Sequence, residues 1–249
     1  MTAAQERTAP EARIHLQRTL ADFFSRTSQT LQEIVLSHKL AAVKAVTKAD
    51  PPKHLPADAQ ALLAKLKPHW DAVAEDVEDD LRIIAQAGGE EALYGLGIDD
   101  EAMLSSVNTV ASDWAEKHAG KLIGKIGDTT RDEIREIVSN AFEDGSTIQE
   151  LARNIRDAGA FSEQRAEMIA STEASRAEQR GNVEGWKASG VVSTLHFVLS
   201  ADHSGPDECD DAAENSPYDI DGDLPDLPIH PNCFCSLVIG SLSGGDEED

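Results

Sequence analysis

The chain is poor in cysteine and in aromatic residues, and its last quarter contains no basic residue. Only three of the 249 residues are cysteines, and aromatic residues make up 4% of the chain. A disulfide-dense secreted scaffold is therefore excluded, and the core must be built from aliphatic side chains. No apolar run approaches the roughly 18 residues of a membrane span, and the first residues lack the apolar stretch of a secretory signal. These absences predict a chain made in the cytosol, with reduced thiols and no membrane contact.

Basic residues stop at Lys187, although acidic residues continue to the end of the chain. The whole chain has 22 Lys and Arg against 46 Asp and Glu, and the fourteen acidic residues after Lys187 have no basic counterpart. Residues 1–60 differ, because they carry eight basic and six acidic residues. So acidic a C-terminal surface repels phosphate, which leaves residues 1–60 as the plausible contact for nucleic acid. A solubilising acidic face is the plain alternative for the C-terminal region.

The first 189 residues have the apolar spacing of helices. We predict helices over 10–48, 57–87, 99–118, 128–142, 147–159 and 162–189. The residues that favour helix starts are Asp99 or Asp100, Thr147 with Glu150 in the capping-box position, and Ser162. The prolines of 49–56 predict a linker, and Gly88–Gly89 predict the end of the second helix. The glycines of 120–127 predict a loosened stretch before a helix capped by Asp128.

After Gly190 the pattern changes from helical spacing to β-branched runs. Residues 191–200 and 234–240 predict short strands, separated by an irregular loop over 201–229. A structureless loop of this length needs something other than a core to hold it.

These patterns predict an α+β protein. A mostly helical N-terminal part should precede a small C-terminal module of one long helix, short antiparallel strands and a long irregular loop. We expect an N-terminal helical arm at 1–55, a helical region at 56–160, the module at 161–240 and a disordered acidic tail at 241–249.

The three cysteines lie in the predicted loop and at the start of the second strand. With one histidine they form the pattern C-x20-H-x2-C-x-C, made by Cys209, His230, Cys233 and Cys235. Three thiolates and an imidazole suit tetrahedral zinc, and a bound metal would replace the core that the loop lacks. We therefore predict one structural zinc ion held by these four residues.

Other interpretations of these residues stay open at this point. The cysteines could be small buried apolar residues, Cys209 could form a disulfide with Cys233 or Cys235, or a thiol could be catalytic. The stretch DHSGPDECDD, which begins at Asp202 and includes His203, could hold calcium or magnesium, although it lacks EF-hand spacing. Reduced thiols argue against the disulfide, and no nucleophile motif, P-loop or recognisable pair of catalytic carboxylates supports an enzyme.

Residues 169–238 combine a T-E-x-x-R-A helix motif, a glycine, a strand, an Asp- and Cys-bearing loop, and H-P-x-C-x-C before a final strand. This arrangement resembles the phage Mu F-like minor head proteins, also called the phage head morphogenesis family. The matching residues are Thr172, Glu173, Arg176, Ala177, Trp186, Gly190, His203, Asp207, Cys209, Asp210, Tyr218, His230, Pro231, Cys233 and Cys235. The family has an arginine where this chain has Phe234, and a second loop cysteine is missing. A four-cysteine site is therefore impossible, and His230 must join the cysteines unless His203 or Asp207 substitutes for it.

The resemblance implies a structural protein of the virion. Such a minor capsid protein would bind the portal protein, the major capsid protein or both during assembly in the host cytoplasm, and would stay inside the phage head. Packaged DNA is a further expected partner of the N-terminal part. No catalysis is expected. A hydrolase- or transferase-like enzyme using the His/Asp/Cys loop, and a zinc module that binds nucleic acid, are the alternatives.

The T-E-x-x-R motif also has two interpretations. Glu173 and Arg176 lie three residues apart on the predicted helix. The simpler interpretation is that they form a surface ion pair. The resemblance favours the other, in which the pair ties the helix to the metal-bearing loop.

Overall fold

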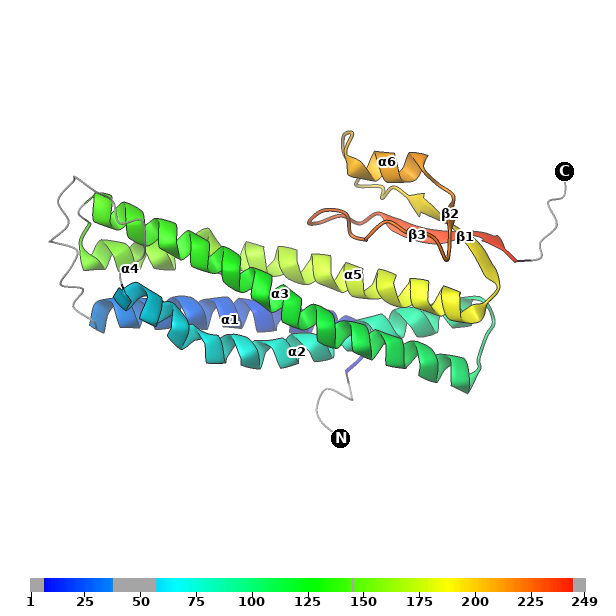
Figure 1. Cartoon of the computed structure of the whole chain (residues 1–249), viewed down its shortest axis with the longest axis horizontal. Helices are drawn as coiled ribbons and strands as arrows, with labels where there is room; N and C mark the ends of the chain where they lie inside the picture. The colour runs from blue at the N-terminus through cyan, green and yellow to red at the C-terminus, as the bar shows by residue number, and fades with distance from the viewer. Residues whose placement is uncertain (1–6, 38–56, 145, 244–249) are drawn as a thin grey trace. The chain divides into compact units, whose positions relative to one another are not determined.

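The computed structural model describes residues 7–37, 57–144 and 146–243, and helices dominate these residues up to Gly190 (Figure 1). The helices are α1 (Ala9–Ser37), α2 (Ala57–Gly95), α3 (Glu101–Glu143), α4 (Ile148–Arg156), the 3-10 turn η2 (Gly159–Phe161), α5 (Glu163–Ser189) and α6 (Glu208–Glu214). The strands are β1 (Val192–Val198), β2 (Tyr218–Asp219) and β3 (Ser236–Leu242). Every strand in the described ranges follows Gly190, which confirms the α+β prediction.

Some predictions concern residues that the structure does not describe. The extension of the first helix to Lys48, the linker at 49–56 and residues 244–249 of the acidic tail lie outside the described residues. Among the helices that are described, none has the combined length and apolar character that crossing a membrane requires.

The chain divides into two compact units, each drawn from separate stretches of sequence. Unit 1 consists of Met1–Leu16, Glu78–His118 and Met168–Asp249, and unit 2 of Gln17–Val77 and Ala119–Glu167. Unit 2 has an aliphatic core from α1, α3 and α4, formed by Leu31, Val35, Ile134, Val138, Ala141, Leu151, Ala152 and Ile155. Unit 1 contains the strands and the cysteines.

Three of the predicted helix starts are confirmed by their capping hydrogen bonds. Thr147 and Glu150 form a reciprocal capping box at the start of α4. Asp100 Oδ1 accepts the N–H of Met103 at 2.9 Å, and Ser162 Oγ accepts the N–H of Arg165 at 3.2 Å. These side chains satisfy N–H groups that have no partner within the helix.

The predicted break between His118 and Asp128 is wrong. One helix, α3, runs from Glu101 to Glu143 without interruption. A single glycine in a helix interior costs about 1 kcal/mol relative to alanine but leaves the backbone hydrogen bonds intact. Buried residues on both sides, such as Ala119 and Ile126, offset that cost. Asp128 caps nothing here, and its carboxylate instead pairs with Arg131 at 2.6 Å.

The predicted end of the second helix at Gly88–Gly89 is also wrong, because α2 continues to Gly95. Gly88 and Gly89 instead lie where α2 crosses α5. A Cβ added at Gly181 of α5 would lie 2.0 Å from the carbonyl oxygen of Ala85 in α2. A Cβ at Gly185 would lie 2.5 Å from the carbonyl oxygen of Gly89. The two helix backbones therefore touch within unit 1, and no side chain fits between them.

Gly181→Ala should destabilise the protein strongly, because the new methyl group would meet backbone rather than a movable side chain. Overpacking of this kind costs roughly 1–3 kcal/mol or more. Gly124→Ala is the matched control, since its Cβ would meet nothing within 4 Å. We expect that control to be neutral or stabilising by up to about 1 kcal/mol. Chemical unfolding of both variants measures the difference, and equal stability would contradict the crossing.

The strands form one antiparallel sheet in the order β2-β1-β3. Successive residues of a strand point to opposite faces. Leu195, Phe197 and Leu237 are buried on the inner face, whereas Val198 and Val238 are exposed on the outer face. This alternation fixes which residues after Gly190 enter the core.

The predicted irregular loop over 201–229 is partly regular, because it contains α6 and β2. The helix has only seven residues, too few for an apolar period to show in the sequence. Asp207 and Asp210 form its capping box, and the hydroxyl of Tyr218 donates to the carbonyl oxygen of Ala212 at 2.7 Å. These contacts connect the end of α6 to β2.

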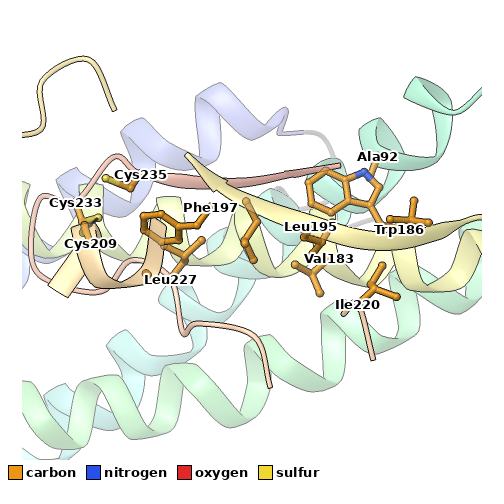
Figure 2. Close-up of a cluster of buried hydrophobic side chains, with 13 residues drawn as sticks. Ala92, Val183, Trp186, Leu195, Phe197, Cys209, Ile220, Leu227, Cys233 and Cys235 are labelled. Carbon is orange, nitrogen blue, oxygen red and sulfur yellow. Dashed lines mark hydrogen bonds between the residues drawn. The ribbon is translucent and has the colours of Figure 1, made fainter. Parts of the chain in front are cut away.

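The core of unit 1 joins this sheet and α6 to α5 and α2. Its buried members are Ala92, Val183, Trp186, Val192, Leu195, Phe197, Cys209, Ala212, Ile220, Leu227, Cys233, Cys235 and Leu237. Figure 2 shows the three cysteines at one end of this core and Trp186 with Ala92 at the other. The thiols therefore close the end of an otherwise apolar core.

Candidate metal centre

Cys209 is positioned by the first turn of α6. The side chain of Asp207, at the N-cap, accepts the N–H of Cys209 at 2.7 Å. The N–H of Asp207 is donated to Asp210 Oδ2 at 2.9 Å, and His203 Nε2 lies 3.0 Å from the same oxygen. Cys209 is fully buried. The thiol therefore points inward from a short helix whose first turn is held by the reciprocal hydrogen bonds of Asp207 and Asp210.

His230 and Cys233 are joined by a tight turn. The N–H of Cys233 is donated to the carbonyl oxygen of His230 at 3.1 Å. Asn232 has a φ of 58°, in the left-handed region that asparagine tolerates better than most residues. Beyond the turn, alternation sends Cys233 and Cys235 into the core and leaves Phe234 57% exposed.

The T-E-x-x-R motif of α5 contacts the segment that carries this turn. Thr172 Oγ1 accepts the N–H of Asn232 at 3.1 Å. Arg176 donates from Nη2 to the carbonyl oxygen of Pro228 at 3.4 Å. Residues four apart lie on the same face of a helix. That face of α5 therefore holds the chain on both sides of His230.

Glu173 is not part of a surface ion pair. Its side chain is 11% exposed and lies 2.6 Å from His118 Nε2 of α3 and 3.5 Å from Arg176 Nε. The His118 ring stacks on Trp114, with centroids 4.7 Å apart. The motif thus links α3, α5 and the loop before His230, as the second interpretation of the sequence proposed.

Cys235 is held at the start of β3. The N–H of Ser200 points to Cys235 Sγ at 3.4 Å. Two residues further on, Leu237 donates its N–H to Gln179 Oε1 of α5 at 3.2 Å. The start of the strand is therefore attached both to the end of β1 and to α5.

These elements bring three of the four predicted ligands together, namely Cys209, His230 and Cys233. Cys209 Sγ lies 3.4 Å from His230 Nε2 and 3.6 Å from Cys233 Sγ. The ligand atoms of Cys209, His230 and Cys233 are all within 4.8 Å of one another, and those of His203, Cys209 and Cys235 form a second such group. The two groups share Cys209. The structure therefore gathers five possible ligands, and it places Cys235 with His203 rather than with His230.

The distances suit a tetrahedral metal. With Zn–S bonds of about 2.3 Å, two sulfur ligands of one zinc ion lie about 3.8 Å apart. The separation of Cys209 Sγ and Cys233 Sγ, 3.6 Å, is close to that value. Thiolates with imidazole are the donors that zinc prefers. Cys209, Cys233 and His230 therefore fit three positions of one zinc site, whereas Cys235 is grouped with Cys209 and His203.

A third group consists of His203, Asp207 and Asp210. The sequence suggested calcium or magnesium for this acidic stretch. Both carboxylates already accept backbone N–H groups at the start of α6. Helix capping therefore accounts for their proximity without a metal.

The surroundings of Cys209 and Cys233 shift the pKa values of these two thiols in opposite directions. Burial raises the pKa of Cys209 above its usual range. Burial also acts to raise the pKa of Cys233, but hydrogen bonds from the backbone N–H of Cys235 and from the Cys209 thiol outweigh it and lower that pKa. A hydrogen bond to the carbonyl oxygen of Pro231 raises the pKa of His230. The arrangement favours a thiolate at Cys233, the form that binds metal.

Residues 132–238 match the family model described as phage Mu protein F like protein. The resemblance seen in the sequence is confirmed for this F-like region, which covers less than half of the chain. No curated protein and no solved structure gave a match.

Sequence reasoning missed several residues that position the F-like region. His118 contacts Glu173 across 55 positions of sequence, and Gln179 contacts Leu237 across 58. Neither His118 nor Gln179 belongs to a local motif, so spacing gives no signal for them. His203 was expected as a substitute zinc ligand or as part of a calcium or magnesium site, whereas the structure groups it directly with Cys209 and Cys235.

Protein purified without chelator should contain about one zinc ion per chain, because the cluster offers thiolate and imidazole ligands at bonding distances. Cys233→Ser should lower this to below about 0.2 and loosen residues 201–235 while the helices persist, since metal binding is coupled to local folding. Elemental analysis and amide hydrogen exchange measure both effects. His203→Ala and His230→Ala, compared directly, identify the fourth ligand. A metal-free wild type with an ordered loop would exclude the zinc site.

Thr172→Val should destabilise the F-like region by about 1–3 kcal/mol, because the N–H of Asn232 would lose its acceptor in a partly buried position. Thr172→Ser keeps the hydroxyl and serves as the control. Chemical unfolding gives the stability, and hydrogen exchange at residues 228–235 shows whether the effect is local. If the valine variant behaves like the serine variant, Thr172 does not hold the turn.

Proposed function

We propose that the protein is a structural minor head protein of a tailed bacteriophage. It binds the portal protein, the major capsid protein or both during head assembly, and it remains inside the head. The observation that carries this proposal is the F-like match at residues 132–238. Thr172 of the T-E-x-x-R motif also accepts the N–H of Asn232, which lies within the H-P-x-C-x-C segment, and Arg176 contacts Pro228 just before that segment.

The cysteine cluster is proposed to have a structural role. Catalytic zinc sites keep one coordination position open, whereas structural sites are closed by protein ligands. Cys209, Cys233 and Cys235 are each no more than 3% exposed. A zinc ion held by them and a histidine would stabilise α6 and the turn after His230 against α5, in a part of the chain that has little core of its own.

The N-terminal helices are the proposed contact with other head components. Residues 1–60 are nearly balanced in charge, so they are also the part of the chain best suited to approach packaged DNA. Within α1, Ile14 is 51% and Leu36 is 52% exposed, so both offer apolar surface to a partner. Deleting the arm at 1–55 would be a poor test, because Leu16 and Leu20 of the same helix are fully buried.

Ile14→Glu and Leu36→Glu should each reduce the amount of protein found in phage heads by about tenfold, because they place a charge in an apolar contact. The helical circular dichroism of the purified variants should be unchanged, since both positions are exposed. Val110→Glu, at a 37% exposed position of α3, is the control. Complementation of a phage that lacks the gene, followed by mass spectrometry of purified heads, measures incorporation.

Two outcomes of this experiment separate the parts of the proposal. Normal incorporation of both α1 variants would exclude α1 as the contact while leaving the head function in place. Absence of the wild-type protein from purified heads would exclude the head function itself.

A further inference from the structure

The outer face of the sheet in unit 1 carries a strip of apolar side chains. Phe234 is 57% exposed, Val198 43% and Val238 39%. Val198 is paired with Ser236 across the sheet, and His196 with Val238. Paired residues point to the same face, so Val198 and Val238 share the outer face. The exposed Phe234 lies two residues before β3, between the buried Cys233 and Cys235. We call these three residues the outer strip.

Folding of unit 1 does not require apolar residues at these positions. The core uses the opposite face, where Leu195, Phe197 and Leu237 are buried. Strand alternation explains why Phe234 points outward, since Cys233 and Cys235 point inward. It does not explain why the residue between the two cysteines is aromatic. Exposed aromatic and branched aliphatic side chains grouped on one face are typical of binding surfaces.

The surroundings of the outer strip are acidic. Asp219 of β2 is paired with Thr194, next to the inward-facing Leu195, and therefore belongs to the outer face. At the other end, the N–H of Ser200 points to Cys235 Sγ, and Asp202, two residues further along the chain, is exposed. Fourteen acidic residues and no Lys or Arg follow Lys187, so the strands and loops of this face contribute neither lysine nor arginine.

We propose that the outer strip binds a partner-protein segment with an apolar centre and basic flanks. The apolar centre would cover Phe234, Val198 and Val238, and the flanks would approach Asp202 and Asp219. An acidic segment or a nucleic acid would be repelled. The proposal goes beyond the head function, because it specifies the chemistry of the segment whichever protein carries it.

The partner segment is proposed to bind the face of the sheet and not to add a strand beside the first residues of β3. β3 is an edge strand in the order β2-β1-β3. A strand added beside β3 would need the outward N–H of Leu237, but Gln179 already accepts that N–H at 3.2 Å. Face-on contact leaves this hydrogen bond intact.

The test uses the full chain and the synthetic peptide acetyl-RRLVLRR-amide as the probe. Methyl-resolved NMR titration should show chemical shift changes at Val198 and Val238. Phe234→Ser should weaken binding at least about tenfold, as loss of an aromatic anchor does. Val238→Thr, which keeps the shape and the strand preference of the side chain, should weaken it in the same direction. Val110→Ser, at an exposed position of α3, should bind like the wild type.

Two further peptides separate apolar contact from charge attraction. Acetyl-RRSSSRR-amide keeps the charge and removes the apolar centre, and acetyl-EELVLEE-amide keeps the centre and reverses the charge. Both should bind at least about tenfold more weakly than the probe. Equal binding of the serine peptide, no effect of Phe234→Ser and Val238→Thr, or no binding of the probe would each overturn the proposal. These results do not depend on whether the protein enters phage heads.

Discussion

The attachment of the chain after Gly190 to α5 is the contact on which the C-terminal part of unit 1 depends. A sheet of three strands, one of them only two residues long, is too small to be stable by itself. Thr172 and Arg176 hold the chain on either side of His230, and Gln179 holds the start of β3. These side chains come from one helix, so the helix acts as a rigid frame for the turn and for the strand.

That frame is itself fixed by packing against α2. Glycines at the crossing let the two backbones approach until no side chain fits between them. Close backbone approach leaves little freedom for α5 to slide or rotate, because interiors are closely packed. The position of the T-E-x-x-R motif, and through it the position of the cysteines, thus depends on glycines in two separate helices.

The cysteine cluster occupies the end of the core where the apolar residues stop. The nearby loop carries many carboxylates and no cation, so mutual repulsion acts against its ordering. Capping of α6 by Asp207 and Asp210 offsets part of this, because helix N-termini favour negative charge. A zinc ion bound as proposed would connect α6 to the turn after His230.

The sequence by itself determined the features that depend on near neighbours. Capping residues such as Thr147 and Ser162 and the β-branched strands after Gly190 act over a few positions, so their consequences could be predicted. The tertiary structure decided the features that depend on distant partners. Gly88 and Gly89 suggested a helix end, because a glycine that ends a helix and a glycine that admits another backbone have the same local signal. Only the presence of α5, about ninety residues later in the chain, distinguishes the two. The same holds for Glu173, whose partner His118 comes from another helix and turns an apparent surface ion pair into a buried connection.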